Sequence, residues 1–131
     1  MSKPRWPRKH AKHYKIPLFP GDLYAFYERE HFDAALLAMN VEKTDPNEHF
    51  GGLAMALEEG DFGNRIYLVG IFDWYPSVCC HEAVHACQYI CEHVGASDNE
   101  TEAYLAQAIF DHLYDHLPEL PKESTDEAKG V

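Results

Sequence analysis

The segment His81-Glu82-Ala83-Val84-His85 carries two imidazoles and a carboxylate at a spacing that suits metal chemistry. On an α-helix, side chains four residues apart lie on one face, so His81 and His85 can hold one ion from the same side. Glu82 then lies at the edge of that face, where its carboxylate can take a proton from water. The pattern predicts a catalytic Zn²⁺ site with Glu82 as general base. The alternative is a pair of partly exposed histidines on a helix, with Glu82 as an ordinary solvated acid.

A third metal ligand is expected downstream, because catalytic zinc sites commonly take three ligands from the protein and keep the fourth position for water. Glu100 and Glu102 both have suitable chemistry. Helix phase separates them, because Ala103 and Tyr104 lie within about 60° of Glu100 on the helical wheel, whereas Glu102 lies about 200° away. The face of Glu100 is small and polar near its start, which suits a close approach to a metal. We therefore predict Glu100 as the third ligand.

Two residues of this downstream stretch have a second interpretation. The run Ser97-Asp98-Asn99-Glu100 also matches a capping box, in which the glutamate binds the amide at the start of the helix and no metal. Tyr104 follows Glu100 by one turn and could hydrogen-bond a ligand or the substrate, although a tyrosine that simply packs in the core fits the position equally well.

The residues around the motif predict the elements that must position it. Ser77 is a suitable N-cap and Gly95 a suitable stop for a helix that contains the motif. A second helix is expected from Asp98 to Leu117, and Pro118 ends it. Its packing face is expected to consist of Ala106, Ile109, Phe110 and Leu113.

Upstream of the motif, the apolar pattern changes from one segment to the next. Two apolar runs, 51–57 and 65–72, are joined by a connection rich in glycine and aspartate, which predicts a β-hairpin. Residues 23–39 have apolar side chains at roughly helical intervals, which predicts a helix with Asp22 as its N-cap. Residues 40–50 are expected to form a loop, and residues 14–19 could add an edge strand.

Four cysteines, Cys79, Cys80, Cys87 and Cys91, lie close to the motif but do not match a C-x-x-C metal pattern. Cys87 and Cys91 fall on the side of the helix away from both histidines, which predicts small buried hydrophobic side chains. A disulfide is disfavoured, because Cys79 and Cys80 are adjacent and a reducing compartment opposes bridging.

Length and composition favour one globular domain. The chain has 131 residues, of which 46% are hydrophobic and 25% charged, enough for a single core. No run approaches the roughly 18 consecutive apolar residues of a membrane helix, and the N-terminus lacks the apolar region of a signal peptide. We therefore expect no membrane partner and a cytoplasmic location.

The formal net charge of −11 is unevenly distributed along the chain. Residues 1–15 carry six Lys and Arg and no acid, whereas the remainder carries five bases and 22 acids. A basic arm with Trp6 and Tyr14 has side chains that bind nucleic acid, but the acidic body would repel phosphate, so an arm lying on its own body is favoured. We predict a basic, Pro-rich arm (1–20), a body (21–118) and an acidic tail (119–131).

The run H-E-A-V-H at 81–85, together with Glu100, Ala103, Tyr104 and Leu105 downstream, resembles the minimal zincin-type metallopeptidases encoded in bacteriophage genomes. More distantly, it is similar to gluzincins, which combine H-E-x-x-H with a downstream E-x-x-A-D or E-x-x-S-D element. The resemblance covers about 65–117 and implies His81, His85 and Glu100 as zinc ligands and Glu82 as general base. A phage-encoded chain would act in the host cytoplasm. Tyr104 stands where the broader group has an acid that orients a ligand histidine.

These features predict an α+β fold, in which a short sheet packs on the motif helix and a second helix carries the third ligand. The expected function is a zinc-dependent metallopeptidase acting on a peptide or protein substrate. The main alternative is a non-catalytic zinc protein that binds a host or phage partner. Retention of Glu82 favours the enzyme, because a structural zinc site needs no base. A third possibility is an accessory factor that binds a protein or nucleic acid through the basic arm.

Overall fold

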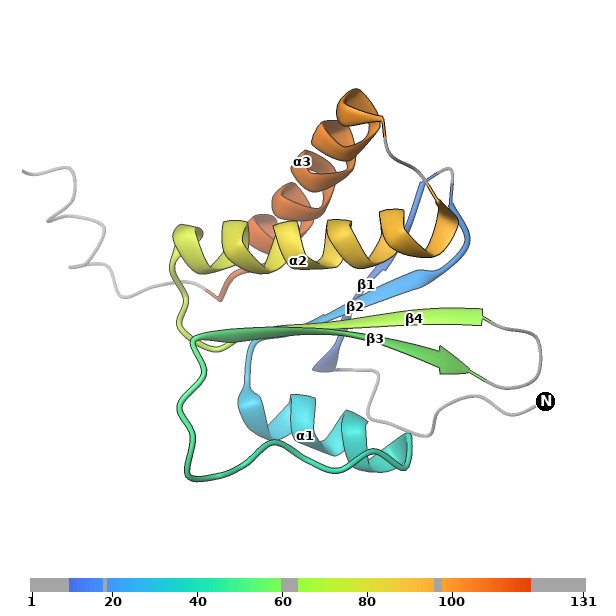
Figure 1. Ribbon diagram of the computed structural model, residues 1–131. Coiled ribbons are helices and arrows are strands. Elements are labelled where there is room, and N and C mark those ends of the chain that lie inside the picture. The colour runs from blue at the N-terminus through green and yellow to red at the C-terminus, as the bar shows by residue number, and fades with distance from the viewer. Residues whose placement is uncertain (1–9, 18, 60–63, 96–97, 119–131) are drawn as a thin grey trace, which may run out of the picture.

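A four-stranded mixed sheet separates one helix from two others in the computed structural model, which describes residues 10–17, 19–59, 64–95 and 98–118 (Figure 1). The strands run in the order β1-β2-β4-β3 across the sheet. Their bounds are β1 Lys12–Lys15, β2 Asp22–Phe26, β3 Gly52–Glu59 and β4 Asn64–Ile71. The helices are α1 Arg29–Ala38, α2 Pro76–Val94 and α3 Asn99–Asp115. The predicted α+β class is confirmed.

The two central strands, β2 and β4, are parallel, and an antiparallel strand lies along each outer edge. Strands β3 and β4 form the hairpin that the two apolar runs predict, with Gly52 opposite Ile71 and Glu59 opposite Asn64. Strand β3 is an edge strand of the sheet, and Figure 1 shows α2 running alongside it. This edge therefore borders the helix that carries the two histidines.

Each face of the sheet has its own core, because side chains alternate between the faces of a strand. Tyr24 and Phe26 of β2 face α1, where they pack with Phe32 and Leu36. The alternate residues of β2 and β4 face α2 and α3. That larger core includes Leu23, Ala25, Tyr67, Val69, Ile71, Ala83, Ala86, Ile90, Leu105, Ile109 and Leu113. Ile109 and Leu113 are buried and Ala106 and Phe110 pack beside them, so the predicted packing face of α3 is confirmed.

The helix predicted over residues 23–39 is wrong in its first half. Residues Asp22–Phe26 form β2, and the helix begins only at Arg29, with Glu28 as its N-cap. Strand β2 is buried on both faces, so its residues form a continuous apolar run in which the alternation of a strand is not visible. Such a run fits a helical wheel as well as a strand.

The motif helix begins earlier than predicted. Pro76 occupies its first turn and Tyr75 is the N-cap, so the assignment of Ser77 as N-cap is wrong. Proline suits this position because its missing amide would have no partner in the first turn. Gly95 ends the helix in the left-handed conformation at φ 74°, which confirms the predicted stop.

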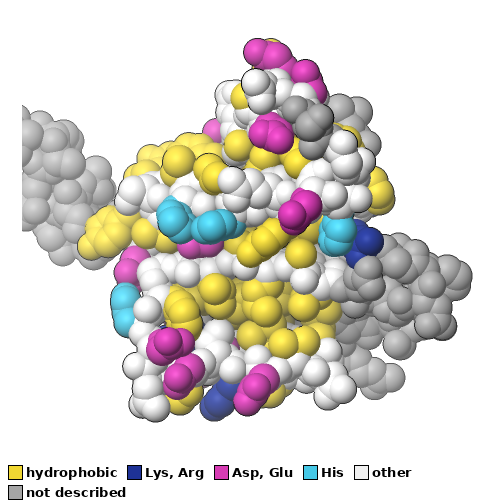
Figure 2. Space-filling view, viewed as in Figure 1, with side chains coloured by type: hydrophobic (Ala, Val, Ile, Leu, Met, Phe, Trp, Pro, Cys, Tyr) yellow, Lys and Arg dark blue, Asp and Glu magenta, His cyan; other side chains and the backbone are white. Residues whose placement is uncertain are grey.

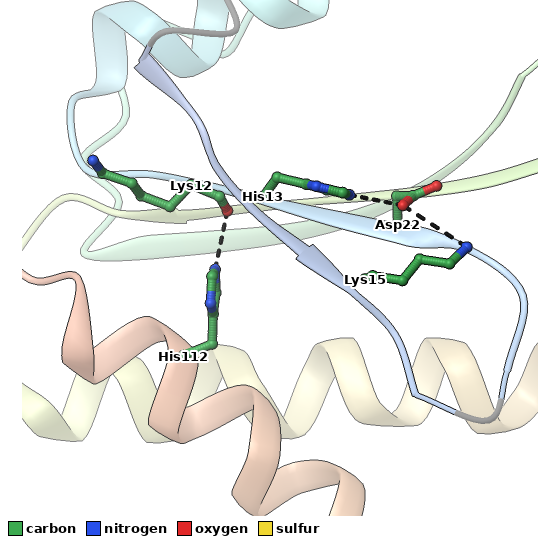
Figure 3. A network of polar contacts seen from close by, with 5 residues as sticks. All are labelled: Lys12, His13, Lys15, Asp22 and His112. Carbon is green, nitrogen blue, oxygen red and sulfur yellow. Dashed lines mark hydrogen bonds and ion pairs between the residues drawn. The ribbon is translucent and has the colours of Figure 1, made fainter.

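Strand β1 attaches part of the predicted N-terminal arm to the body (Figure 3). His13 Nε2 lies 2.7 Å from Asp22 Oδ1 on β2, and Lys15 Nζ lies 4.0 Å from the same oxygen. On the other side, His112 Nε2 of α3 lies 3.0 Å from the carbonyl oxygen of Lys12. Residues 12–15 are therefore an integral strand, while 1–9 and the predicted tail 119–131 lie outside the described residues.

The cysteines agree with their predicted roles. Cys87 and Cys91 are buried against the larger core, and all four cysteines are free thiols. Burial raises the pKa of the Cys79 thiol to about 11 and that of Cys87 to about 12. These thiols are therefore packing groups rather than thiolate ligands at neutral pH.

In the part of the chain that the structure describes, we find no helix with the length and apolar character needed to cross a membrane.

Candidate functional site

Helix α2 divides its side chains between the sheet and the solvent. Glu82, Ala83, Ala86 and Cys87 are buried, whereas His81 and His85 are exposed one turn apart. Figure 2 shows histidine side chains gathered on the visible surface of α2, next to a band of hydrophobic side chains over the sheet edge. The helix therefore presents the two imidazoles to solvent while its other side fixes the backbone against the core.

The two imidazoles converge. Their Nε2 atoms lie 3.2 Å apart and their ring centroids 4.7 Å apart. Two nitrogens bound to one tetrahedral zinc at about 2.0–2.1 Å each would be separated by roughly 3.3 Å. The observed separation therefore fits two ligand positions of a zinc ion. It also fits a hydrogen bond in which one neutral ring donates to the other.

Glu82 follows His81 on α2 and is 5% exposed. Burial raises the pKa of its carboxyl group, and the neighbouring His81 and His85 partly oppose this shift. Within the described ranges, the carboxyl group has no hydrogen-bond or ion-pair partner. Glu82 is thus a buried acid whose side chain faces an open groove without a structural partner.

The groove has a volume of about 500 Å³ and runs between the start of β3 and the first turns of α2. Its lining consists of His49, Phe50, Gly51, Gly52, Ser77, Val78, His81 and Glu82. His85 lies one helical turn beyond His81, at the end of this groove. Ligands that enter it therefore meet the Glu82 carboxyl group and the imidazoles of His49 and His81 directly.

His49 is a groove residue that the sequence did not reveal. Its Nε2 atom lies 3.2 Å from Oδ2 of Asp73, which follows β4 in the chain. The amides of Phe72 and Asp73 both donate to the carbonyl of Gly51 at 2.9 Å, which fixes this corner of the groove. An imidazole whose Nε2–H donates to a carboxylate in this way can accept a hydrogen bond at Nδ1 from a bound molecule. No local pattern joins His49 to Asp73, because the two residues meet only when β3 and β4 pair.

Arg29 at the start of α1 positions the loop that carries His49. Its guanidinium donates to the carbonyls of Asp45 and Glu48 and to Oγ1 of Thr44, and it lies 4.8 Å from the ring centre of Phe50. The predicted loop over 40–50 is confirmed, and this clamp gives it one defined course. The outer wall of the groove therefore depends on α1, on the opposite face of the sheet.

Glu100 is not brought to the two histidines. It is exposed in the first turn of α3, and no cluster of three His, Cys, Asp or Glu side chains suited to a metal occurs in residues 10–17, 19–59, 64–95 and 98–118. A hollow of about 340 Å³ lies between α2 and α3, lined by Val84 and Gln88 from α2 and by Asn99 and Ala103 among the residues of α3. Val84 and Gln88 both lie on one side of His85 on the helix surface, and the hollow separates them from the first turns of α3.

The other predicted residues of α3 are also placed. Tyr104 is 69% exposed, so it is not a core tyrosine. Asp98, rather than Ser97, is the N-cap, and its carboxylate accepts from the amide of Thr101 at 2.9 Å. Ser97 lies outside the described residues, and with Asp98 as the N-cap the alternative of a capping box that ends at Glu100 does not apply. The two hydrogen bonds from Thr101 lower the pKa of Asp98.

Comparison of the chain with family models, with curated proteins and with solved structures finds no match.

Proposed function

We propose that the protein is a zinc-dependent metallopeptidase whose catalytic base is Glu82. The observation that carries this proposal is a buried glutamate, 5% exposed as a residue, whose carboxyl group lacks a partner among the described residues, faces a groove, and lies beside two converging imidazoles. A polar group buried without a hydrogen bond costs about 1–3 kcal/mol in proteins. A stabilising role does not explain this cost, whereas proton transfer in the groove does.

The donor set fits zinc at two positions. His81 and His85 would hold the ion through Nε2, and zinc bound there would supply Lewis acidity toward water and a substrate carbonyl. The third position remains our proposal for Glu100. Its carboxylate would have to close across the hollow next to Val84 and Gln88 to reach the ion. The exposure of Glu100 leaves its side chain available for that movement.

Glu82 performs the proton chemistry in this proposal. Its raised pKa brings the carboxyl closer to the range in which it can both accept and return a proton near neutral pH. It takes a proton from the attacking water and delivers it to the nitrogen that leaves when the peptide bond breaks. His49 lines the same groove, and its Nδ1 would accept a hydrogen bond from the substrate.

A peptide is the substrate class that the groove supports best. Strand β3 is an edge strand, and its residues Leu53 to Leu57 are apolar and half-buried. An extended peptide can pair with such an edge through its backbone, and the edge leads directly to Gly52, Glu82 and His81. Backbone pairing would place a peptide carbonyl near the buried carboxyl group.

A non-catalytic binding protein is the second candidate. It is favoured because, among the residues described, no His, Cys, Asp or Glu side chain joins His81 and His85 in an arrangement that could hold a metal. In that case β3 would bind a partner segment and the two imidazoles would hydrogen-bond each other.

Metal content and peptide cleavage, measured together, separate the two candidates. Wild type, Glu82→Gln and His85→Ala are loaded with zinc, analysed for bound metal, and incubated with a peptide library read by mass spectrometry. A metallopeptidase requires zinc-dependent cleavage by wild type, loss of cleavage with retained zinc in Glu82→Gln, and loss of both in His85→Ala. Cleavage by Glu82→Gln at the wild-type rate would remove Glu82 from the mechanism. Zinc binding without cleavage in wild type would favour the binding protein.

A further inference from the structure

The position of the Glu82 side chain depends on Gly52, the sheet residue that faces it. Gly52 is the first residue of β3, and it lines the groove together with Val78 and Glu82 of α2. At this point the helix and the strand come closer than two ordinary side chains would allow.

The space at Gly52 can be judged from the distances between a Cβ placed on this residue and the neighbouring atoms. A Cβ added at Gly52 would lie 2.8 Å from Cγ of Glu82, 2.8 Å from Cγ1 of Val78 and 2.9 Å from the carbonyl oxygen of Gly70. All three separations are shorter than van der Waals contact between such atoms. The backbone of Gly52 does not lie in the left-handed region, so the glycine is needed for space rather than for its φ angle.

The neighbouring glycine provides a contrast. A Cβ added at Gly51 would meet Oδ2 of Asp73 at 3.0 Å and the next atom only at 3.7 Å. Its nearest neighbour is thus the end of one side chain, and the three nearest atoms all belong to Asp73 and none to α2. Of these two adjacent glycines, only Gly52 makes room for the motif helix.

We propose that Gly52 is a positioning residue for Glu82. Because β3 has no side chain at this point, the stem of Glu82 packs directly on the strand, and its carboxyl group is held at the groove beside His81. Packing rather than hydrogen bonding fixes the acid, which agrees with its lack of a partner in the described ranges. The proposal extends the proposed function, but the contact itself can be tested without it.

The first test is a double-mutant cycle in thermal unfolding of the metal-free, full-length protein. Gly52→Ala should lower Tm, and this loss should be smaller in a Glu82→Ala background, because the added methyl then no longer meets Cγ of Glu82, although it still meets Val78 and the Gly70 carbonyl oxygen. Gly51→Ala is the matched control and should have the same effect on Tm in both backgrounds. Equal losses for Gly52→Ala in both backgrounds would overturn the proposal.

The second test follows the carboxyl group itself. In protein labelled with ¹³C at glutamate side chains, the Glu82 signal is assigned by its absence in Glu82→Gln, and spectra are compared at one fixed pH. Gly52→Ala should shift this signal, and Gly51→Ala should leave it in place. A Glu82 signal that both alanine variants leave unmoved would contradict a positioning role.

Whether the variants fold also tests the proposal that Gly52 positions Glu82. If Gly52→Ala does not fold, recovery of folding in Gly52→Ala/Glu82→Ala supports the proposal. Failure to fold in both backgrounds would assign the tight contact to Val78 and the Gly70 carbonyl, and would overturn it.

Turnover distinguishes this inference from the proposed function. If the wild type cleaves peptides, Gly52→Ala should lower kcat by about 10–100-fold with KM and zinc content close to wild type, because a base displaced by about 1 Å loses its alignment. An unchanged kcat would overturn the positioning role. If the wild type cleaves no peptide, the proposed function fails, while the unfolding cycle and the carboxyl signal still decide on Gly52.

Discussion

At the residue scale, the unusual feature is an acidic side chain that is buried. Among the described residues, Glu82 is the one buried polar or charged side chain, and its immediate neighbours on α2 are apolar or imidazole. Burial of an unpartnered carboxyl group lowers stability, and proteins retain such groups chiefly where function needs them. The loss of folding stability can therefore be measured, because replacing the acid by an apolar side chain of similar shape should increase the free energy of unfolding.

Glu82→Met should raise the free energy of unfolding of the metal-free protein by about 1–3 kcal/mol at neutral pH, because it removes an unpartnered buried acid and keeps the packing volume. Urea unfolding followed by circular dichroism measures the change. Glu92→Met, an exposed glutamate on the same helix, is the matched control and should change stability by less than about 0.5 kcal/mol. A destabilised Glu82→Met protein would mean that the carboxyl group contributes to the fold.

At the scale of elements, a tyrosine after β2 connects the parts that hold α2 in place. The hydroxyl of Tyr27 donates to the carbonyl of Leu113 in α3 at 2.8 Å. Its own carbonyl accepts from Nε1 of Trp74, in the segment before α2, at 2.9 Å. Burial raises the pKa of Tyr27, so it stays a neutral donor. This residue joins the sheet to the last turn of α3 and to the entry of the motif helix.

Tyr27→Phe should lower the free energy of unfolding by about 1–3 kcal/mol, because it leaves the Leu113 carbonyl buried without its donor. Tyr114→Phe, where the side chain is 48% exposed, serves as the control and should stay within about 0.5 kcal/mol of wild type. Chemical denaturation of the three proteins side by side gives the comparison. Equal stabilities of Tyr27→Phe and wild type would show that water replaces the lost donor.

At the scale of the whole molecule, His112 joins the two ends of the described chain. It contacts the Lys12 carbonyl through Nε2 (Figure 3). Its ring lies beside those of Tyr14 and His116, at centroid distances of 4.9 and 4.6 Å. Burial lowers the pKa of His112 below its ordinary value of 6.5; nearby His116 and His13 act in the same direction, while the Lys12 carbonyl and Asp115 oppose it. The folded protein therefore favours the neutral ring.

The pH dependence of stability follows from this sign. Because the unfolded chain protonates His112 more readily than the folded protein, stability is fully present above pH 6.5 and falls as pH decreases through 6.5 toward the lowered pKa. His112→Gln keeps a donor for the Lys12 carbonyl but cannot be protonated, so it should lose less stability than wild type between pH 7.5 and about pH 5. Thermal unfolding across this range provides the measurement. Parallel curves for both proteins would contradict the assignment.

The sequence predicted those elements that are specified by residues close together in the chain. The hairpin, the helix around the motif, the stop at Gly95 and the packing face of α3 each depend on residues close together in sequence. Strand β2 could not be distinguished from a helix, because burial on both faces hides its alternation. The groove could not be predicted either, since His49 meets Asp73, and Gly52 meets Glu82, only in the folded chain in which β3 pairs with β4. Helix phase predicted which face of α3 packs, but not the distance of Glu100 from the histidines.

The most direct test of the proposed metal centre is diffraction from zinc-loaded crystals, recorded at the zinc absorption edge. We expect an anomalous peak about 2.0–2.1 Å from Nε2 of both His81 and His85, with the Glu100 carboxylate closing the third position. Absence of a peak between the two rings, with the imidazoles hydrogen-bonded to each other, would contradict a zinc hydrolase.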